Sequence, residues 1–231
     1  LVGFCFFRHY YLLLKLNKYF YKKSKNMFPP QRLYILRHGQ TNFNLQRIVQ
    51  GRGINSDLNE TGLAQAKAFF EHYKHLPFCA VYASNLKRTQ QTIAHFETIG
   101  HRIECFGELD EISWGKHEGR PLTPSDKANY MQVKNDWDKG NWNVATPDGE
   151  SPLDVQERLQ VFLNHLYQQK HEATLICTHG RTSRILLCML LKQPLYEMDT
   201  HKHSNTSLAK LEWQNDKYEL VFSGNVEHLA L

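Results

Sequence analysis

The sequence predicts an α/β fold in which a mostly parallel central sheet is covered by helices on both faces. Short, almost continuously apolar runs alternate along the chain with longer segments whose apolar residues recur at helical spacing. Runs of the first kind are typical of strands buried on both sides, as the strands of parallel sheets are. In addition, two of these runs, residues 32–37 and 173–178, are each followed at once by a His-Gly pair.

The expected elements follow one another in a regular order. The segment 61–76 carries Leu63, Ala66 and Phe70 on one helical face and is closed by Pro77. A later helix is expected to begin at Ser151, with Asp154 three residues further on as its capping partner. The expected strands are residues 32–37, 78–83, 102–106, 173–178, 206–213 and 217–222, and the expected helices are residues 61–76, 85–96, 151–167 and 181–191.

Composition limits the class of protein and of partner. The chain of 231 residues is 41% hydrophobic, enough for one continuous core, and no Pro-, Gly- or Ser-rich linker divides it, so we take residues 27–231 as one domain. Its formal net charge of +5 is concentrated in lysines of the first 25 residues. Because no run of basic residues with interleaved aromatics follows, we do not expect a nucleic acid as partner.

Two further features concern the cellular location of the protein. The cysteines (Cys5, Cys79, Cys105, Cys177 and Cys188) form no C-x-x-C pair, so we expect reduced, buried thiols in a cytoplasmic protein. In residues 1–26 an apolar stretch is interrupted by Arg8 and falls short of the roughly 20 residues that span a bilayer. Its charges follow the apolar stretch, unlike those of a signal peptide. We therefore interpret residues 1–26 as an extension upstream of Met27, with a basic, aromatic peripheral membrane anchor as the alternative.

Four short segments carry groups that suit phosphate chemistry: LRHGQT (36–41), SNLKRT (84–89), ELDEI (108–112) and CTHG (177–180). Ligands of open parallel sheets lie beyond the carboxyl ends of the strands, so His38 and His179 are expected to share a site. A site that transfers a phosphoryl group needs cationic donors around a nucleophile, and Arg37 and Arg88 can bind its oxygens in pairs. Their charge should also keep His38 neutral and able to attack phosphorus.

Together, and in this order, these motifs resemble the histidine phosphatase superfamily, also called the phosphoglycerate mutase-like family, with its R-H-G-x-T signature. The resemblance runs from about residue 32 through His179 and the helix after it, and includes LNETGLAQA, SNLKRTQQT, EISWGKHEG and PDGES. It implies a phosphoglycerate mutase-like fold, a phosphohistidine that forms and is hydrolysed, and no metal or other cofactor. The implied catalytic residues are His38, Glu111, His179, Arg37 and Arg88, and the implied substrate contacts are Arg37, Gly39, Asn44, Gln50, Gly51, Arg88, His179 and Gly180.

Each of these residues also has a structural interpretation. A lone histidine at a strand end is more often satisfied by backbone contacts than catalytic, and surface arginines are ordinarily ion-pair partners. Asp110 and Glu108 adjoin Glu111, and spacing alone does not select among the three carboxylates. Only the match of Glu111 to the acid of the family does so.

Other polar and aromatic residues are expected to have structural roles. Thr41 is expected to cap a helix or turn. His201 and His203 are expected to be solvated loop residues, because no cysteine or carboxylate cluster completes a metal site around them. The long central segment contains aromatic side chains that can belong either to the core or to a lid over the substrate, namely Trp114, Tyr130, Trp137 and Trp142.

The first functional expectation is a phosphatase that acts on a small phosphorylated metabolite. The alternatives are phosphoryl transfer of the phosphoglycerate mutase type and a noncatalytic phosphate-binding regulatory module. The short segment EISWGKHEG after the acid, and the few residues after the last expected strand, favour the phosphatase. No G-x-x-x-x-G-K-[ST] motif or metal-binding cluster suggests a P-loop enzyme or a metallophosphatase. Residues 120–148 are expected to form the pocket beyond the phosphate and so to determine which substrate binds. The sequence does not determine the oligomeric state, and a homodimer is one possibility.

Overall fold

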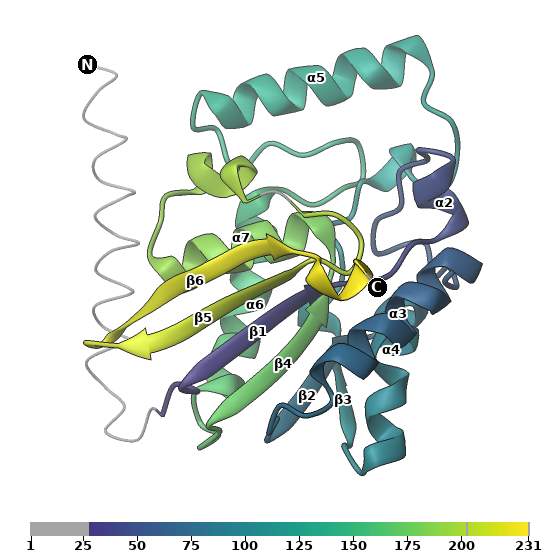
Figure 1. Cartoon of the computed structure of the whole chain (residues 1–231). Coiled ribbons are helices and arrows are strands. Elements are labelled where there is room, and N and C mark those ends of the chain that lie inside the picture. The colour runs from purple at the N-terminus through teal and green to yellow at the C-terminus, as the bar shows by residue number, and fades with distance from the viewer. Residues whose placement is uncertain (1–27, 202, 231) are drawn as a thin grey trace.

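The computed structural model describes residues 28–201 and 203–230, so the expected extension, residues 1–26, lies outside the described residues. The alternating pattern forms one six-stranded sheet of order β3-β2-β4-β1-β5-β6 (Figure 1). β1, β2, β3 and β4 are parallel, whereas β5 runs antiparallel to β1 and pairs with β6 in a hairpin. The strands are β1 (Arg32–Arg37), β2 (Ala80–Ser84), β3 (Ile103–Phe106), β4 (Ala173–Thr178), β5 (Leu208–Gln214) and β6 (Lys217–Asn225). The predicted mostly parallel sheet is thus confirmed, with an antiparallel edge.

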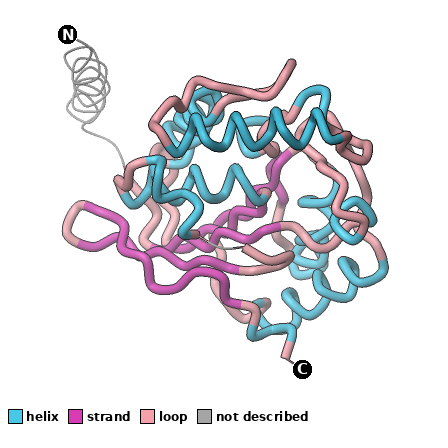
Figure 2. Tube along the Cα trace, turned by 90° about the horizontal axis from the view of Figure 1, so that it is seen from above, coloured by secondary structure: helices cyan, strands magenta, loops and turns pink. Residues whose placement is uncertain are grey.

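Helices cover both faces of this sheet, as Figure 2 shows from above. α3 and α4 pack on one face, and α6 and α7 pack on the other. The α-helices are α2 (Asn42–Leu45), α3 (Glu60–Tyr73), α4 (Lys87–Ile93), α5 (Pro124–Asp138), α6 (Pro152–Leu166) and α7 (Gly180–Leu191). Short 3-10 helices are η1 (Ala94–Ile99), η2 (Gly107–Leu109), η3 (Gly115–His117), η4 (Leu195–Thr200) and η5 (Glu227–Leu229). In the described part of the chain, no helix combines the length and the apolarity that crossing a membrane requires.

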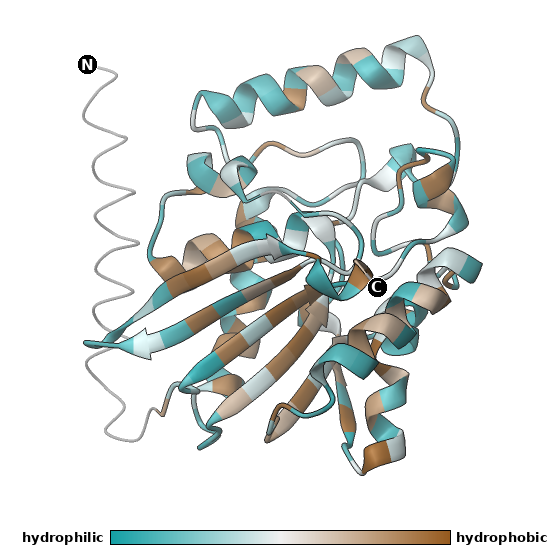
Figure 3. Ribbon diagram, in the orientation of Figure 1, coloured by the Kyte–Doolittle hydropathy of each residue, from teal (hydrophilic) through white to brown (hydrophobic). Residues whose placement is uncertain are grey.

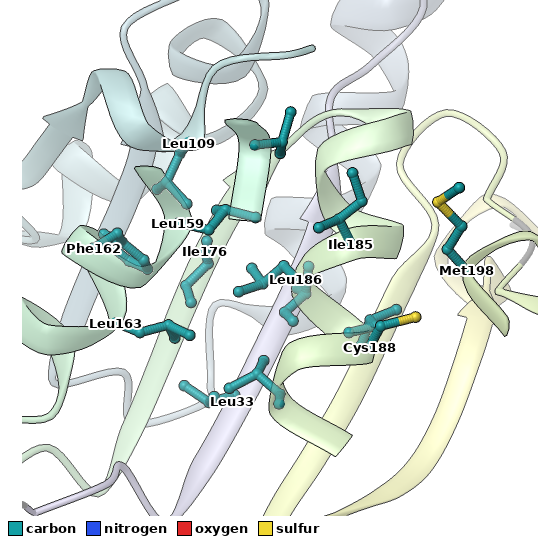
Figure 4. Packing of buried hydrophobic residues seen from close by; sticks show 14 of the residues in the cluster. Leu33, Leu109, Leu159, Phe162, Leu163, Ile176, Ile185, Leu186, Cys188 and Met198 are labelled. Atoms are coloured by element: carbon teal, nitrogen blue, oxygen red, sulfur yellow. The ribbon is translucent and has the colours of Figure 1, made fainter. Parts of the chain in front are cut away.

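The central strands divide the core into two layers because their side chains point alternately to opposite faces. In β1, Leu33 and Ile35 pack with the residues of α6 and α7, whereas Tyr34 and Leu36 pack with those of α3. The middle of the sheet is accordingly apolar (Figure 3), and Figure 4 shows leucine and isoleucine side chains filling the space between β1, β4 and the two helices α6 and α7. Burial on both faces explains why β1 and β4 match their predicted bounds residue for residue.

The central segment, residues 120–148, contains the helix α5, which the sequence did not predict. Only Val133 and Trp137 of its fifteen residues are buried, so its apolar face is too narrow to give a periodic pattern. Trp137 is fully buried and donates its indole N–H to Val144 O at 2.8 Å. The central aromatics therefore belong to the core: Trp114 and Trp137 are buried in it, and Tyr130 and Trp142 pack against it.

Three smaller expectations have clear outcomes. Thr41 caps α2, as predicted, and Ser151 caps α6 with Asp154 in a reciprocal capping box. The expectation that the cysteines are buried is wrong for Cys79 and Cys105, which are exposed, and right for Cys177 and Cys188. Cys105 is exposed because it lies on β3, the outermost strand on that side of the sheet.

The expectation that His201 and His203 are solvated is also wrong. Both side chains are buried, with 4% and 9% of their surface exposed. The physical reason is that the chain after η4 turns back to enter β5, which places His201 against Gln193 at 2.9 Å and His203 beside Arg37. A polar loop sequence does not reveal such burial, because the burial depends on contacts far along the chain.

Candidate active site

The candidate site forms where β1 and β4 end side by side. Arg37 and Thr178 are in register across this parallel pair, so the next residue of each strand lies at the same edge of the sheet. The rings of His38 and His179 have centroids 5.1 Å apart, and both are buried. The structure thus brings together the two histidines that the sequence predicted to share a site.

His38 is held as a neutral imidazole with one nitrogen free. Its Nδ1 lies 2.7 Å from Gly39 O, so Nδ1 carries the proton and donates it to that carbonyl. Burial, followed by the charges of Arg88 and Arg37, lowers the pKa of His38 well below its usual value. Near neutral pH, Nε2 therefore presents a lone pair toward the site.

Arg88, in the first turn of α4, is fully buried. Its Nε donates to His179 Nδ1 at 3.1 Å, and its Nη1 and Nη2 donate to Ile54 O at 2.6 Å and Gly51 O at 3.3 Å. Burial lowers the pKa of Arg88 to about 10, so the guanidinium keeps its charge at neutral pH. Backbone carbonyls of the loop after α2 thus orient a buried positive charge at the site.

His179 has partners at both ring nitrogens. Because Arg88 can only donate, Nδ1 accepts, and Nε2 carries the proton that faces Ser84 Oγ at 2.7 Å. Burial, followed by the charge of Arg88, lowers the pKa of His179 well below its usual value. To donate to a phosphoryl oxygen, His179 must release Ser84. Ser84 was not among the predicted site residues, although its position directly after the predicted strand 78–83 was a usable signal.

Arg37 lies on the other side of the site. Its Nη1 donates to His203 O at 2.8 Å, and its buried Nε has no hydrogen-bond partner among the described residues. A Cβ added at Gly180 would lie 3.6 Å from Arg37 Nε and Cζ, so the guanidinium packs directly on the start of α7. An unpaired buried N–H at this place is suited to an incoming oxyanion.

Glu111 is the carboxylate at this edge of the sheet. It accepts hydrogen bonds from the backbone N–H of Arg181 and Thr182, at 3.1 and 3.0 Å, and from the Thr182 hydroxyl at 3.1 Å. Its neighbour Asp110 instead accepts from Asn85 N at 2.9 Å and faces Arg52 at 3.6 Å. The geometry thus separates two of the three carboxylates that sequence spacing left equivalent.

The remaining predicted contacts surround these groups as a supporting shell. The backbone N–H of Gly39 donates to Thr92 Oγ1 at 2.9 Å, and Asn44 Oδ1 accepts from Asn205 Nδ2 at 3.2 Å. Gln50 donates to Thr41 Oγ1 at 2.7 Å. Gly51 gives its carbonyl to Arg88, and a Cβ there would lie 2.0 Å from Glu118 Oε1. These residues order the loop that follows the first histidine, and Asn205 is a member of the shell that the sequence analysis did not name.

This arrangement can bind a tetrahedral oxyanion and attack it. Arg37 and Arg88 supply guanidinium charge, and His38 Nε2 supplies the lone pair. The carboxylate of Glu111 lies at the N-terminus of α7, on the same edge of the sheet. No group of three or more histidine, cysteine, aspartate or glutamate side chains within residues 28–201 and 203–230 is placed to hold a metal ion.

Comparison with known proteins agrees with this geometry. The model of the histidine phosphatase superfamily (branch 1) matches residues 33–226. The chain is 25% identical over 199 residues, covering 86% of the chain and 97% of the relative, to a protein of Hydrogenobacter thermophilus named phosphoserine phosphatase 2. It is 28% identical over 208 residues to a protein of Proteus mirabilis named phosphoglycerate mutase GpmB, covering 86% of the chain and 94% of that relative.

A solved structure shares the architecture as well. The mycobacterial glucosyl-3-phosphoglycerate phosphatase, solved with VO3, superposes with a TM-score of 0.74 at 25% identity, covering 84% of this chain and 100% of that one. The fold, the order of the motifs and the family match all lead to one assignment: this chain is a member of the histidine phosphatase superfamily, branch 1.

Proposed function

We propose that the protein is a metal-independent phosphomonoester hydrolase that acts on a small phosphorylated metabolite through a phosphohistidine on His38. One observation carries the proposal. The neutral ring of His38 offers a free Nε2 at a buried point that the charges of both Arg37 and Arg88 reach. A buried nucleophile beside two guanidinium groups suits a substrate that carries negative charge on nonbridging oxygens.

The proposed reaction has two steps. In the first, which starts with Glu111 in its protonated form, His38 Nε2 attacks phosphorus, the bond from phosphorus to the ester oxygen breaks, and Glu111 gives that proton to the leaving alkoxide. In the second, Glu111 takes a proton from water as that water attacks the phosphohistidine, which releases phosphate and restores His38. Arg37 and Arg88 hold the nonbridging oxygens in both steps, and His179 joins them when it turns from Ser84.

The supporting shell has a proposed part in binding. Gly39 and Gly180 let the backbone approach the phosphoryl group, while Asn44, in α2, and Gln50 and Gly51, in the loop after α2, border it. The names of two relatives support hydrolysis, because one is named as a phosphoserine phosphatase and another as a glucosyl-3-phosphoglycerate phosphatase. We also propose a cytoplasmic location, which is supported by the free thiols of all four cysteines within the described residues.

Phosphoryl transfer of the mutase type is the second candidate, because a relative 28% identical is named phosphoglycerate mutase. Both reactions begin with the same attack by His38 and differ in what accepts the phosphoryl group. A mutase returns it to a bound product, whereas a phosphatase gives it to water. A noncatalytic phosphate-binding module is the third candidate, and it predicts binding without turnover.

The test measures release of p-nitrophenol and phosphate from p-nitrophenyl phosphate in excess EDTA. We expect wild-type turnover that His38→Ala abolishes and that His75→Ala, a matched change at an exposed histidine, leaves intact. A rapid alkaline quench with labelled substrate should trap a phosphoenzyme that survives base and is lost in acid, as a phosphoramidate is. Full turnover by His38→Ala would overturn the mechanism. Transfer of label to unlabelled 3-phosphoglycerate in preference to water would favour the mutase.

A further inference from the structure

The peptide unit between Gly39 and Gln40 is hydrogen-bonded on both of its sides. Its carbonyl, Gly39 O, accepts from His38 Nδ1 at 2.7 Å. Its N–H, that of Gln40, donates to Gln65 Oε1 of α3 at 2.9 Å. The unit is trans, so these two groups point in opposite directions, one toward the His38 ring and the other toward α3. One rigid plane therefore joins the Gln65 side chain to the imidazole.

The direction of both hydrogen bonds follows from the groups that make them. A backbone N–H can only donate, so the Gln65 atom that faces Gln40 is the amide oxygen. A carbonyl can only accept, so the proton of the neutral His38 ring is on Nδ1 and Nε2 keeps its lone pair. Burial lowers the pKa of His38 well below its usual value, so near pH 7 the neutral ring has two possible tautomers. The orientation of the Gly39 carbonyl selects between them.

Gly39 gives this plane little restraint of its own. Glycine adopts a wide range of backbone torsions, and a side chain has no room here, since a Cβ would lie 2.8 Å from Gly62 O. The preceding peptide is held separately, because its N–H, that of Gly39, donates to Thr92 Oγ1 of α4 at 2.9 Å. The plane that faces the His38 ring is fixed on its outer side by the bond to Gln65, which comes from a helix packed on the core.

We propose that Gln65 is a positioning residue for the nucleophile: by holding the peptide between Gly39 and Gln40, it keeps the proton of His38 on Nδ1 and the attacking lone pair on Nε2. Gln65 acts through this peptide and not on the substrate. The two hydrogen bonds polarise the same peptide group, so each strengthens the other. This inference rests on the proposed function, because it takes His38 as the nucleophile, and it assigns the choice of tautomer to a side chain of α3.

The test observes the tautomer directly by nitrogen-15 NMR of the full chain, which distinguishes a protonated ring nitrogen from one that carries a lone pair. The His38 signals are assigned by their absence in His38→Ala. In wild type at pH 7, we expect the proton on Nδ1. Gln65→Met has a side chain of similar length without the amide oxygen, so the Gly39 carbonyl is free to leave Nδ1 and we expect comparable populations of the two tautomers. An Nε2–H population below about a tenth in this variant would overturn the proposal.

Two further variants separate positioning from a general loss of structure. Gln65→Glu keeps an oxygen that can accept from Gln40 N–H, so it should keep the wild-type tautomer. Gln91→Met removes a bond of the same kind, in which Gln91 Oε1 accepts from Leu58 N at 2.8 Å, outside the peptide that faces His38. It should also keep the wild-type tautomer. If either variant shifts the tautomer as far as Gln65→Met does, the proposal fails.

Wild type alone also tests the proposal, which matters if Gln65→Met does not fold. Amide hydrogen exchange at Gln40 should be slow, because its N–H is bonded to a side chain of α3. Fast exchange at Gln40, or a proton on His38 Nε2 in place of Nδ1, would contradict the proposal without any variant.

A single-turnover measurement connects the tautomer to the chemistry. At saturating p-nitrophenyl phosphate, the rate of phosphohistidine formation in Gln65→Met should fall by about twofold or more, at least in proportion to the lost Nδ1–H population, because only that tautomer can attack. A wild-type rate despite the shifted tautomer would refute the role of Gln65 in attack. If the tautomer shifts but wild type forms no phosphohistidine, the hydrolase proposal fails and the control of the tautomer by Gln65 stands. If wild type forms phosphohistidine and the tautomer does not shift, only this inference fails.

Discussion

The carboxyl edge of β1 and β4 and the helix α5 of the central segment are built in opposite ways. At the edge, His38 and His179 follow strands buried on both faces, so the position of each side chain is fixed by the core beneath it. In α5, only Val133 and Trp137 are buried, and most of the other residues are polar. The comparison suggests that the core fixes the phosphoryl chemistry, whereas a loosely attached segment is free to vary with the substrate.

The largest effect should come from removing a charge at the edge. Arg88→Ala takes away the buried guanidinium that touches His179, and we expect kcat/KM for p-nitrophenyl phosphate to fall by about 10³-fold. Arg102→Ala, at an exposed site, should change kcat/KM less than twofold. Circular dichroism and thermal melting check that the variant is folded. A folded Arg88→Ala protein with more than a tenth of wild-type activity would contradict the assigned role.

The next largest effect concerns how firmly α5 is anchored to the core. Trp137→Ala removes a fully buried indole that packs near Trp114, and we expect the free energy of unfolding to fall by about 3–5 kcal/mol. Met131→Ala, in the same helix but 56% exposed, should change it by less than about 0.5 kcal/mol. Urea denaturation measures both. Similar values for the two variants would show that α5 is not anchored through Trp137.

The same contrast explains what the sequence could predict. β1, β4 and the expectation that His38 and His179 share a site followed from buried strands, whose apolar runs are visible in one sequence. α5 was missed because its burial is confined to two side chains, and the environment of His203 was missed because it is buried by contacts with residues far along the chain. Glu111 needed the family resemblance, since only the fold shows that its carboxylate, unlike that of Asp110, meets the start of α7.

Low pH should lower the free energy of unfolding, because histidines that are buried and neutral in the folded protein bind protons when the chain unfolds. His203 has a folded-state pKa of about 3, lowered first by burial, against about 6.5 when unfolded, so the unfolded chain binds more protons between these values. Its contribution to stability is therefore fully present above about pH 6.5 and is lost as pH falls toward 3. Over 1.5 pH units, from 6.5 to 5, the loss amounts to about 2 kcal/mol.

The variant His203→Gln isolates this contribution. Urea denaturation at pH 6.5 and at pH 5 should show wild type losing about 2 kcal/mol more than the variant, because the other buried histidines titrate alike in both proteins. His75→Gln, at an exposed histidine, should reproduce the wild-type difference between the two pH values. An equal loss in wild type and His203→Gln would mean that His203 is already protonated in the folded protein.

The smallest expected effect comes from removing a single helix cap, and it can be compared between α6 and α5 with one matched pair of variants. Ser151 caps α6 and Thr123 caps α5, and each hydroxyl exchanges hydrogen bonds with an aspartate three residues later, Asp154 and Asp126. Ser151→Ala should lower the free energy of unfolding by about 1 kcal/mol, because the first turn of α6 already buries Pro152 and cannot fray alone.

Thr123→Ala should act only locally, since residues 124–128, the first turn of α5, include no buried side chain and can open without exposing core. Amide hydrogen exchange should therefore speed up in residues 124–128 while the urea midpoint stays nearly constant. If the two cap variants shift that midpoint equally, α5 is coupled to the core as tightly as α6. The central segment would then be as constrained as the edge of the sheet that carries His38 and His179.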